Sequence, residues 1–177
     1  MRADAEQNRE RILEVARTAL KASSAASLQS IAKAAGVGQG TLYRHFPSRE
    51  ALLIAVYRHD LDELIAAAPA LLREQSPREA LRSWFERLAA YGRIKHGVAE
   101  AVEAATRADL SGEYYAPVVQ AITLLLDAGK AAGTLRTDVD AEDVLLLVGF
   151  LWRNDFGAER EARTRHLLSV VMDGLRP

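Results

Sequence analysis

Apolar residues recur at intervals of three and four along most of this chain, with polar residues at the positions between them. In the first segment the apolar stripe consists of Ile12, Leu13, Ala16, Ala19 and Leu20. Such a stripe indicates an amphipathic helix that packs on one side. No segment shows the strict alternation of apolar and polar residues that a half-buried strand requires. The sequence therefore predicts an all-α fold.

Capping residues divide this pattern into helices. Asp4 followed by Gln7 resembles a capping box and predicts the start of the first helix. Ser27 is placed to cap a short second helix that ends before Gly36. Glycine is common just after a helix, because it adopts the left-handed conformation without a steric penalty. Two apolar-faced helices are therefore expected before residue 36.

Prolines and further caps predict the boundaries in the rest of the chain. Pro47 ends a third helix, and Ser48 begins a fourth that reaches about Ala67, with Pro69 marking its end or a kink. The stretch SPRE, residues 76–79, has a cap, a proline at the first helical position and a glutamate three residues after the cap. The remaining helices are predicted over residues 98–108, 111–132, 140–153 and 161–175.

The stretch GVGQGTLYRHF, residues 36–46, contains three glycines and admits two interpretations. One interpretation is a loop that binds a nucleotide phosphate. The dinucleotide pattern GxGxxG would need its third glycine at the position of Thr41, however, and that pattern follows a strand, whereas this stretch follows a predicted helix. A P-loop also needs a Lys-Ser or Lys-Thr pair, which is missing after these glycines. A nucleotide site is therefore not predicted here.

The other interpretation is a helix-turn-helix. This motif needs a short apolar-faced helix, a tight turn with glycine, and a second helix whose outer face meets DNA. Residues 28–35, 36–38 and 39–46 meet these requirements in order. Val37, Leu42 and Phe46 fall on the inner side, where they would lock the two helices together. The outer side and its edge carry Gln39, Gly40, Thr41, Tyr43, Arg44 and His45.

The outward side chains have the chemistry of a DNA-binding surface. Gln39 can hydrogen-bond a base edge, with adenine the favoured partner, and Arg44 can form a bidentate pair with guanine or bind a phosphate. Thr41, Tyr43 and His45 offer donors to phosphate oxygens, which set the register of the protein on the duplex rather than read its sequence.

Two neighbouring features extend this surface. Gly40 has no side chain, which would let the backbone approach the groove closely. Ser48 and Arg49 begin the next helix, whose free N–H groups and positive dipole end favour a phosphate. The glycines are therefore assigned to a tight turn and to a close approach of the backbone to DNA. The phosphates that this surface would bind are those of the DNA backbone.

The order of these residues is similar to that of a known family. The stretch LQSIAKAAGVGQGTLYRHFPSREALL, Leu28 to Leu53, resembles the DNA-binding end of TetR-type bacterial transcriptional regulators, and its TLYRHFPSREALL portion is highly specific to them. Gly38 stands where serine is frequent, which would remove a phosphate contact, and Arg49 stands where lysine is usual, which keeps the charge. The predicted DNA-binding residues are Ser27, Gly38, Gln39, Gly40, Thr41, Tyr43, Arg44, His45, Ser48 and Arg49.

The resemblance also implies the role of the rest of the chain. Beyond Arg58 the likeness is only architectural, and in such proteins a divergent helical domain binds a small ligand and forms a homodimer. We therefore expect a helix-turn-helix DNA-binding domain over residues 1–58 and a helical effector-binding and dimerisation domain over residues 59–177. The net charge of −1 divides into +4 up to Arg58 and −5 beyond it, as expected for a nucleic-acid contact at one end.

An effector pocket would be concave and mostly apolar, with a few polar groups. The candidate effector-binding residues are Trp84, Tyr91, Arg93, Glu103, Tyr114, Tyr115 and Trp152. The stripe around Trp84 also fits a packed core, and both interpretations stay open. Residues 144–152 are apolar all round, which indicates burial on more than one side, in a two-fold interface or in a monomeric core. The last helix would contribute Leu167, Leu168, Val171 and Leu175 to that interface.

Composition limits the other functions that the chain could have. The absence of cysteine excludes disulfides, thiolate metal sites and a cysteine nucleophile. The histidines outside residues 36–46 are too far apart in sequence to suggest a metal site, and no catalytic motif is present. We therefore expect no metal, no cofactor and no enzymatic activity. The longest apolar run is too short to cross a membrane and the N-terminus lacks the apolar core of a signal peptide, so a cytoplasmic location is expected.

The sequence thus predicts a DNA-binding transcriptional regulator that acts as a homodimer. We expect it to be a repressor that a small-molecule effector releases from a near-palindromic operator in double-stranded DNA. Two other classes stay open: a small helical ligand-binding protein or enzyme without specific DNA binding, and a protein that binds nucleic acid without sequence preference. Neither explains the order of turn, glycines, aromatic and basic residues in residues 36–46.

Overall fold

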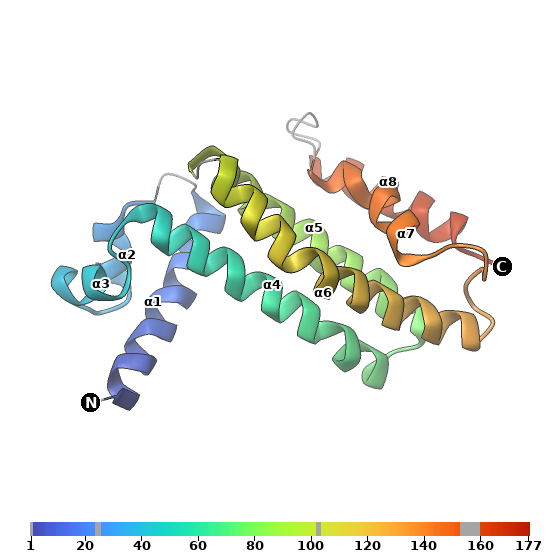
Figure 1. The fold of residues 1–177 in the computed structure, drawn as a ribbon, viewed down its shortest axis with the longest axis horizontal. Helices are drawn as coiled ribbons and strands as arrows, with labels where there is room; N and C mark the ends of the chain where they lie inside the picture. Colours follow the sequence, from blue (N-terminus) through green and yellow to red (C-terminus); the bar gives the residue numbers. More distant parts are fainter. Residues whose placement is uncertain (1, 24–25, 102–103, 153–159) are drawn as a thin grey trace. The chain divides into compact units, whose positions relative to one another are not determined.

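The computed structural model describes residues 2–23, 26–101, 104–152 and 160–177 of the chain (Figure 1). These residues form helices joined by short turns, and no strand occurs among them. The predicted all-α fold is confirmed. The chain divides into two compact units, one formed by Met1–Asp60 with Arg93–Ala104 and the other by Leu61–Gly92 with Ala105–Pro177.

The first unit is built around a small core that four helices share. These are α1 (Arg2–Ala22), α2 (Leu28–Ala34), α3 (Gln39–His45) and the beginning of α4 (Arg49–Glu74). The core consists of Ile12, Leu13, Ala16, Ile31, Ala32, Ala35, Leu42, Phe46, Leu52 and Val56. The helix α1 packs against both α2 and α3 and so supports the two helices of the helix-turn-helix.

The predicted start of the first helix is wrong by three residues. The helix α1 already includes Arg2, so Asp4 lies inside it and is not its N-cap. The acidic and amide residues that suggested a cap also favour the first turn of a helix, and sequence alone does not separate these two positions. The Ser27 cap is confirmed: its hydroxyl accepts a hydrogen bond from the Ser30 backbone N–H at 3.1 Å.

The turn between α2 and α3 has the geometry that its glycine predicts. Gly36 has a φ of +67°, in the left-handed region. The Val37 N–H donates to the Ala32 carbonyl at 3.0 Å and the Gly36 N–H donates to the Lys33 carbonyl at 3.2 Å. This pair of bonds is a Schellman motif, which satisfies the last carbonyls of α2 and reverses the chain. The direction of α3 therefore follows from a local turn.

The helix α4 does not end before Pro69 but continues to Glu74, so the predicted end near Ala67 is wrong. A proline inside a helix removes one backbone hydrogen bond and disfavours the preceding turn. Here the turns on both sides of it are held by burial of Leu64, Ala68 and Leu71. The Leu64 carbonyl also accepts a hydrogen bond from the Trp84 indole at 2.8 Å. Tertiary packing thus outweighs the local preference of the proline.

Two long helices replace the shorter ones predicted in the middle of the chain. The helix α5 (Pro77–Ala101) begins at the predicted proline and continues without a break past residue 98, where a separate helix was predicted to start. The helix α6 (Ala104–Ala131) is continuous across residues 109 and 110 and includes Gly112 and Pro117, so the predicted break between residues 98–108 and 111–132 is wrong. Within an otherwise strong helix a single glycine costs only about 1 kcal/mol, which the flanking turns offset.

The C-terminal part of the second unit contains α7 (Ala141–Leu147), the 3₁₀ helix η1 (Val148–Trp152) and α8 (Arg160–Gly174). Asp140 and Asp143 form the capping box that opens α7, which confirms the predicted start at residue 140. The predicted helix over residues 140–153 is shorter in the structure, because the α-helical part ends at Leu147 and Arg153 lies outside the described residues.

Hydrogen bonds between distant segments hold the second unit together. The Arg136 N–H donates to the Leu175 carbonyl at 2.9 Å, and the Arg136 guanidinium donates to the Gly174 carbonyl at 3.2 Å. Leu168 and Leu175 are buried within their own chain. Their predicted place in an interface between two copies is therefore wrong, because they hold α8 against the core of the same unit.

Candidate nucleic-acid interface

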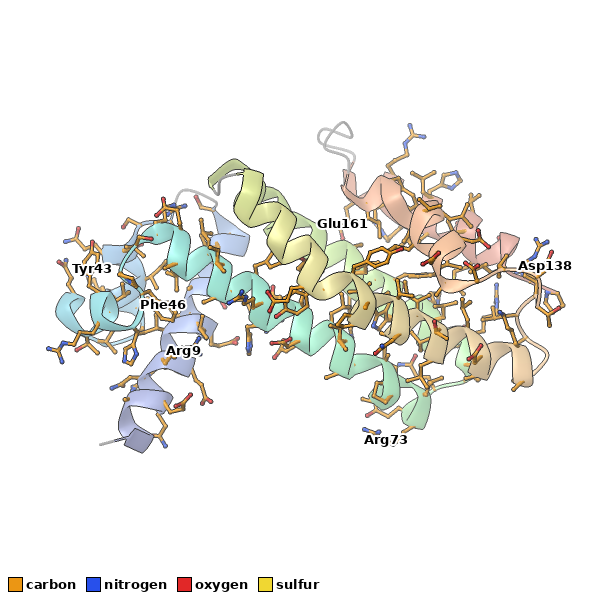
Figure 2. The ribbon with its side chains drawn as sticks, viewed as in Figure 1. Arg9, Tyr43, Phe46, Arg73, Asp138 and Glu161 are labelled. Carbon is orange, nitrogen blue, oxygen red and sulfur yellow. The ribbon has the colours of Figure 1, made fainter. Side chains whose placement is uncertain are left out.

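The helix α3 has one buried face and one exposed face. Leu42 and Phe46 are fully buried in the core of the first unit, and Val37 packs against that core from the turn. Figure 2 shows Phe46 beside α1, close to Arg9. The inner face predicted from the sequence is therefore confirmed. It fixes the rotation of α3 about its own axis, and this rotation decides which side chains point outward.

The outward face carries the predicted polar residues. Gln39, Gly40, Tyr43 and Arg44 are exposed, and Thr41 and His45 are half-buried at the edge. Tyr43 exposes 49% of its surface, so its ring is accessible to a partner on this face. The helix thus presents an amide, an aromatic ring and a guanidinium together, which is the combination that reads base edges and binds phosphate.

No contact within the protein requires glycine at position 40. A Cβ atom built on Gly40 would have no heavy atom within 4 Å, and the same is true of Gly38. Gly38 is the N-cap of α3 and makes no side-chain capping bond, since it has no side chain. A small residue at these positions leaves the backbone of the first turn of α3 open to a close approach from outside.

The start of α4 lies next to this surface in the chain and is well capped. The Ser48 hydroxyl accepts a hydrogen bond from the Ala51 N–H at 3.1 Å. Hydrogen bonds from its own backbone N–H and from the Ser48 hydroxyl hold the pKa of Glu50 below its usual value. Because the Ser48 hydroxyl already accepts from Ala51 and donates to Glu50, the predicted phosphate contact at this position would use the nearby backbone N–H groups.

Arg49 makes a contact that the sequence does not reveal. Its guanidinium donates to the Ala26 carbonyl, in the segment just before α2. This bond ties the start of α4 to the start of the helix-turn-helix. Ser27 follows Ala26 directly, is exposed, and accepts from Ser30 as the N-cap of α2. The predicted DNA-binding residues Ser27, Ser48 and Arg49 therefore lie at the N-terminal ends of α2 and α4.

Two features of this unit escape the sequence reasoning. The Arg9 guanidinium carbon lies 5.7 Å from the centre of the Phe46 ring, a cation–π contact between α1 and the end of α3. Arg17 forms an ion pair with Asp60, in which Arg17 Nε lies 2.5 Å from Asp60 Oδ1. No local motif predicts either pair. The sequence does carry a signal for the Arg17–Asp60 pair, because the carboxylate of Asp60 interrupts the buried apolar stripe of α4 between Val56 and Leu64.

The candidate effector-binding residues do not share one environment. Trp84, Tyr91 and Tyr114 are buried in the second unit. Tyr115 is half exposed, and its hydroxyl donates to Glu142 Oε1 at 3.3 Å. Glu103 and the side chains of Arg93 and Trp152 lie outside the described residues. Effector binding at these seven residues therefore stays a prediction.

Other kinds of site receive no support in the described part of the chain. Among those residues, no group of three or more histidine and carboxylate side chains is placed to hold a metal ion. No helix described by the structure is both long enough and apolar enough to span a membrane.

Family models match both parts of the chain. Residues 12–56 match the model described as bacterial regulatory proteins of the tetR family, and residues 76–177 match the model described as the C-terminal domain of SbtR-like transcriptional regulators. The first match covers the helix-turn-helix with parts of α1 and α4, and the second runs from the start of α5 to the C-terminus.

Individual relatives agree with these matches. An HTH-type transcriptional regulator of Staphylococcus aureus (strain USA300) is 43% identical over 67 residues, which are 37% of this chain and 36% of that relative's length. A solved TetR transcriptional regulator from Streptomyces coelicolor is 37% identical, with a TM-score of 0.80 over 96% of this chain and 98% of the other. A solved TetR regulatory protein from Mycobacterium vanbaalenii is 32% identical, with a TM-score of 0.77 over 99% of both chains. The chain belongs to the TetR family of bacterial transcriptional regulators.

Proposed function

We propose that this protein is a sequence-specific repressor that binds a near-palindromic operator as a homodimer and leaves it when a small molecule binds. The observation that supports this most is the division of α3 into a locked face with Leu42 and Phe46 and an outward face with Gln39, Tyr43 and Arg44. A fixed helix with an exposed reading face suits insertion into the major groove. We place this activity in the cytoplasm, where bacterial DNA lies.

Exposed apolar side chains on the last two helices support a homodimer. Leu146 and Leu147 on α7 expose 81% and 53% of their surface, and Val170 on α8 exposes 54%. Burial of such exposed apolar side chains against a partner is favourable. A second copy would cover them by an isologous contact, in which the same residues of both chains meet. Two copies also supply the two recognition helices that a palindromic operator requires.

We retain residues 1–58 as the DNA-binding domain and residues 59–177 as the effector-binding and dimerisation domain. The helix α4 is continuous from Arg49 to Glu74, and the two compact units divide between Asp60 and Leu61 within it. One rigid element thus belongs to both units. A ligand that selects one arrangement of the second unit would shift the equilibrium of the first through this helix.

Substitution of the outward residues tests the proposed function. Tyr43→Ala and Arg44→Ala should each weaken operator binding by about 1–3 kcal/mol, roughly tenfold or more, because each removes a contact to DNA. Neither side chain belongs to the core of the first unit, so the thermal midpoint should stay within a few degrees of the wild type. The affinities are measured by fluorescence anisotropy with a labelled operator duplex.

The matched control is Thr18→Ala, which removes an exposed side chain from α1. This variant should bind the operator as the wild type does. Wild-type affinity in folded Tyr43→Ala and Arg44→Ala would contradict the assignment of α3 as the reading helix. Tight binding of a small molecule by a protein without sequence-specific DNA affinity would favour the ligand-binding or enzymatic alternative.

A further inference from the structure

A carboxylate lies in the buried stripe of α4, at the end of the first unit. Asp60 is 6% exposed and is the one buried polar or charged residue among the described side chains. It follows Val56 by one helical turn, and Val56 belongs to the core that holds the helix-turn-helix. A buried carboxylate is costly unless a counter-charge meets it, so its position needs an explanation beyond packing.

The counter-charge comes from α1. The 2.5 Å contact joins Arg17 Nε to Asp60 Oδ1, and the Arg17 side chain is about one quarter exposed. Arg17 also lies 3.8 Å from Glu14, measured from its NH1 to Glu14 Oε2, but Glu14 is mostly exposed on the same helix. The buried pair therefore connects two helices, whereas the exposed pair lies within one.

The position of the pair relates it to the recognition helix. Arg17 follows Ala16, whose side chain is buried in the shared core with Leu42 of α3. Asp60 is the last residue of α4 that belongs to the first unit. The pair thus fixes α4 against α1 at the point where α4 leaves the helix-turn-helix.

A buried ion pair is weak evidence for stability, and in some proteins such a pair specifies the register of two elements. Desolvation of the two charges offsets much of their attraction, so an apolar pair of similar size often stabilises a protein as well or better. A shift of α4 along α1 would separate the two charges and move the buried Asp60 carboxylate away from its counter-charge on α1. The pair therefore disfavours alternative registers more strongly than apolar contacts, which tolerate sliding.

We propose that Arg17 and Asp60 are a positioning pair that sets the register of α4 against α1, so that the helix-turn-helix and the first part of α4 move as one body. The position of α4 then sets the orientation in which α3 meets the operator, and a displacement of α4 displaces α3 with it. The expected effect on operator binding rests on the proposed function. The register of α4 against α1 rests only on the geometry of the Arg17–Asp60 pair.

The test removes both charges together in one variant and only the Asp60 charge in a second variant. The double variant Arg17→Met/Asp60→Leu keeps the volume of the pair apolar, and Asp60→Asn removes one charge. Asp62→Asn is the matched control, since it makes the same chemical change on the same helix at an exposed position. Glu14→Gln is the second control, because it removes the exposed partner of Arg17.

Two readouts are measured on full-length protein. The first is the distance distribution between spin labels on Ala5→Cys and Ala66→Cys, which are exposed positions on α1 and α4 of a chain without native cysteine. The second is affinity for the operator, with the thermal midpoint measured in parallel. In the double variant we expect a wild-type or higher midpoint, a broadened or shifted distance distribution, and operator affinity reduced at least about tenfold.

The controls should keep the wild-type distance distribution and affinity. A folded double variant with an unchanged distance distribution would overturn the inference, whether or not an operator is known. Unchanged operator affinity in that variant would overturn it as well. If Asp60→Asn does not fold, the double variant still gives both readouts. Failure of the wild type to select any operator would contradict the proposed function, while the distance measurement would still decide the register.

Discussion

Glycines in this chain serve different purposes, and the structure separates them. Gly36 needs its positive φ of 67° to reverse the chain after α2. Gly129 approaches another segment so closely that an added Cβ would lie 2.3 Å from Leu135 Cδ1. Gly40 has neither requirement, since nothing lies within 4 Å of its added Cβ. Packing and backbone conformation in the described part of the chain therefore do not require glycine at position 40, which leaves room for the proposed close approach to DNA.

A pair of alanine substitutions distinguishes these purposes. Gly36→Ala should lower the free energy of unfolding by about 1–2 kcal/mol, because alanine is strained in the left-handed region. Gly40→Ala should leave stability unchanged or raise it by up to about 1 kcal/mol, since alanine favours helix, and yet weaken operator binding. Thermal unfolding and operator titration check both effects. Full operator affinity in Gly40→Ala would contradict the close approach at this position.

Asp138 provides a prediction about pH. Hydrogen bonds from the Arg136 guanidinium at 2.6 and 2.7 Å lower the pKa of Asp138 to about 2. A carboxyl with a lowered pKa in the folded state stabilises that state above its unfolded pKa, near 4, and loses this contribution as pH falls toward 2. Asp138→Asn should therefore lower stability at pH 7, and the difference from wild type should shrink between about pH 4 and pH 2. Chemical denaturation across this range measures it, and a difference that stays constant would contradict the ion pair.

The outward residues of α3 were predictable from sequence, whereas their supporting contacts were not. Helical periodicity places Leu42 inward and Tyr43 outward, and the structure agrees. The contacts of Arg49 with Ala26 and of Arg17 with Asp60 join residues distant in sequence. Such pairs depend on how helices pack: Asp60 within the apolar stripe of α4 indicates that a counter-charge is needed, but a single sequence does not identify its partner.

At the scale of elements, caps predicted helix starts well and prolines predicted helix ends less well. Ser27, Pro77 and Asp140 mark starts in the structure as expected. Pro47 follows the end of α3 as expected, whereas Pro69 lies inside α4. A cap acts through bonds within one turn, so its effect is readable locally. The cost of a proline is offset by packing against other helices, which depends on residues elsewhere in the chain.

Substitution of Trp84 tests whether packing stabilises the part of α4 around Pro69. Its indole N–H donates to the Leu64 carbonyl, one turn before Pro69, and the ring is fully buried. Trp84→Phe should lower the free energy of unfolding by about 1–3 kcal/mol from the lost hydrogen bond, with a further loss from the smaller ring. Urea denaturation measures the change. An unchanged midpoint would show that this contact does not hold α4.

At the scale of the whole molecule, the exposed apolar face of α7 and α8 leads to a prediction about assembly. Leu146→Glu should convert the homodimer to a folded monomer, because Leu146 is 81% exposed in the single chain and a buried charge would be costly between two copies. Operator affinity should fall with it, since one recognition helix binds only a half-site. Sedimentation velocity measures the mass in solution.

Leu124→Glu is the matched control for this prediction. Leu124 is also a large apolar residue and 44% exposed, but it lies on α6 rather than on α7 or α8. This variant should remain a dimer. A dimer that persists in Leu146→Glu would contradict the proposed interface and move it to another surface.

Selection of bound sequences from random double-stranded DNA with the full-length protein tests the central claim most directly. The selection is run at near-physiological salt, because low salt strengthens contacts that do not depend on sequence. We predict enrichment of an inverted repeat whose half-sites lie about one helical turn, or a modest multiple of it, apart. Absence of any enriched sequence from folded protein would contradict a sequence-specific regulator and would favour a ligand-binding or enzymatic role for the second unit.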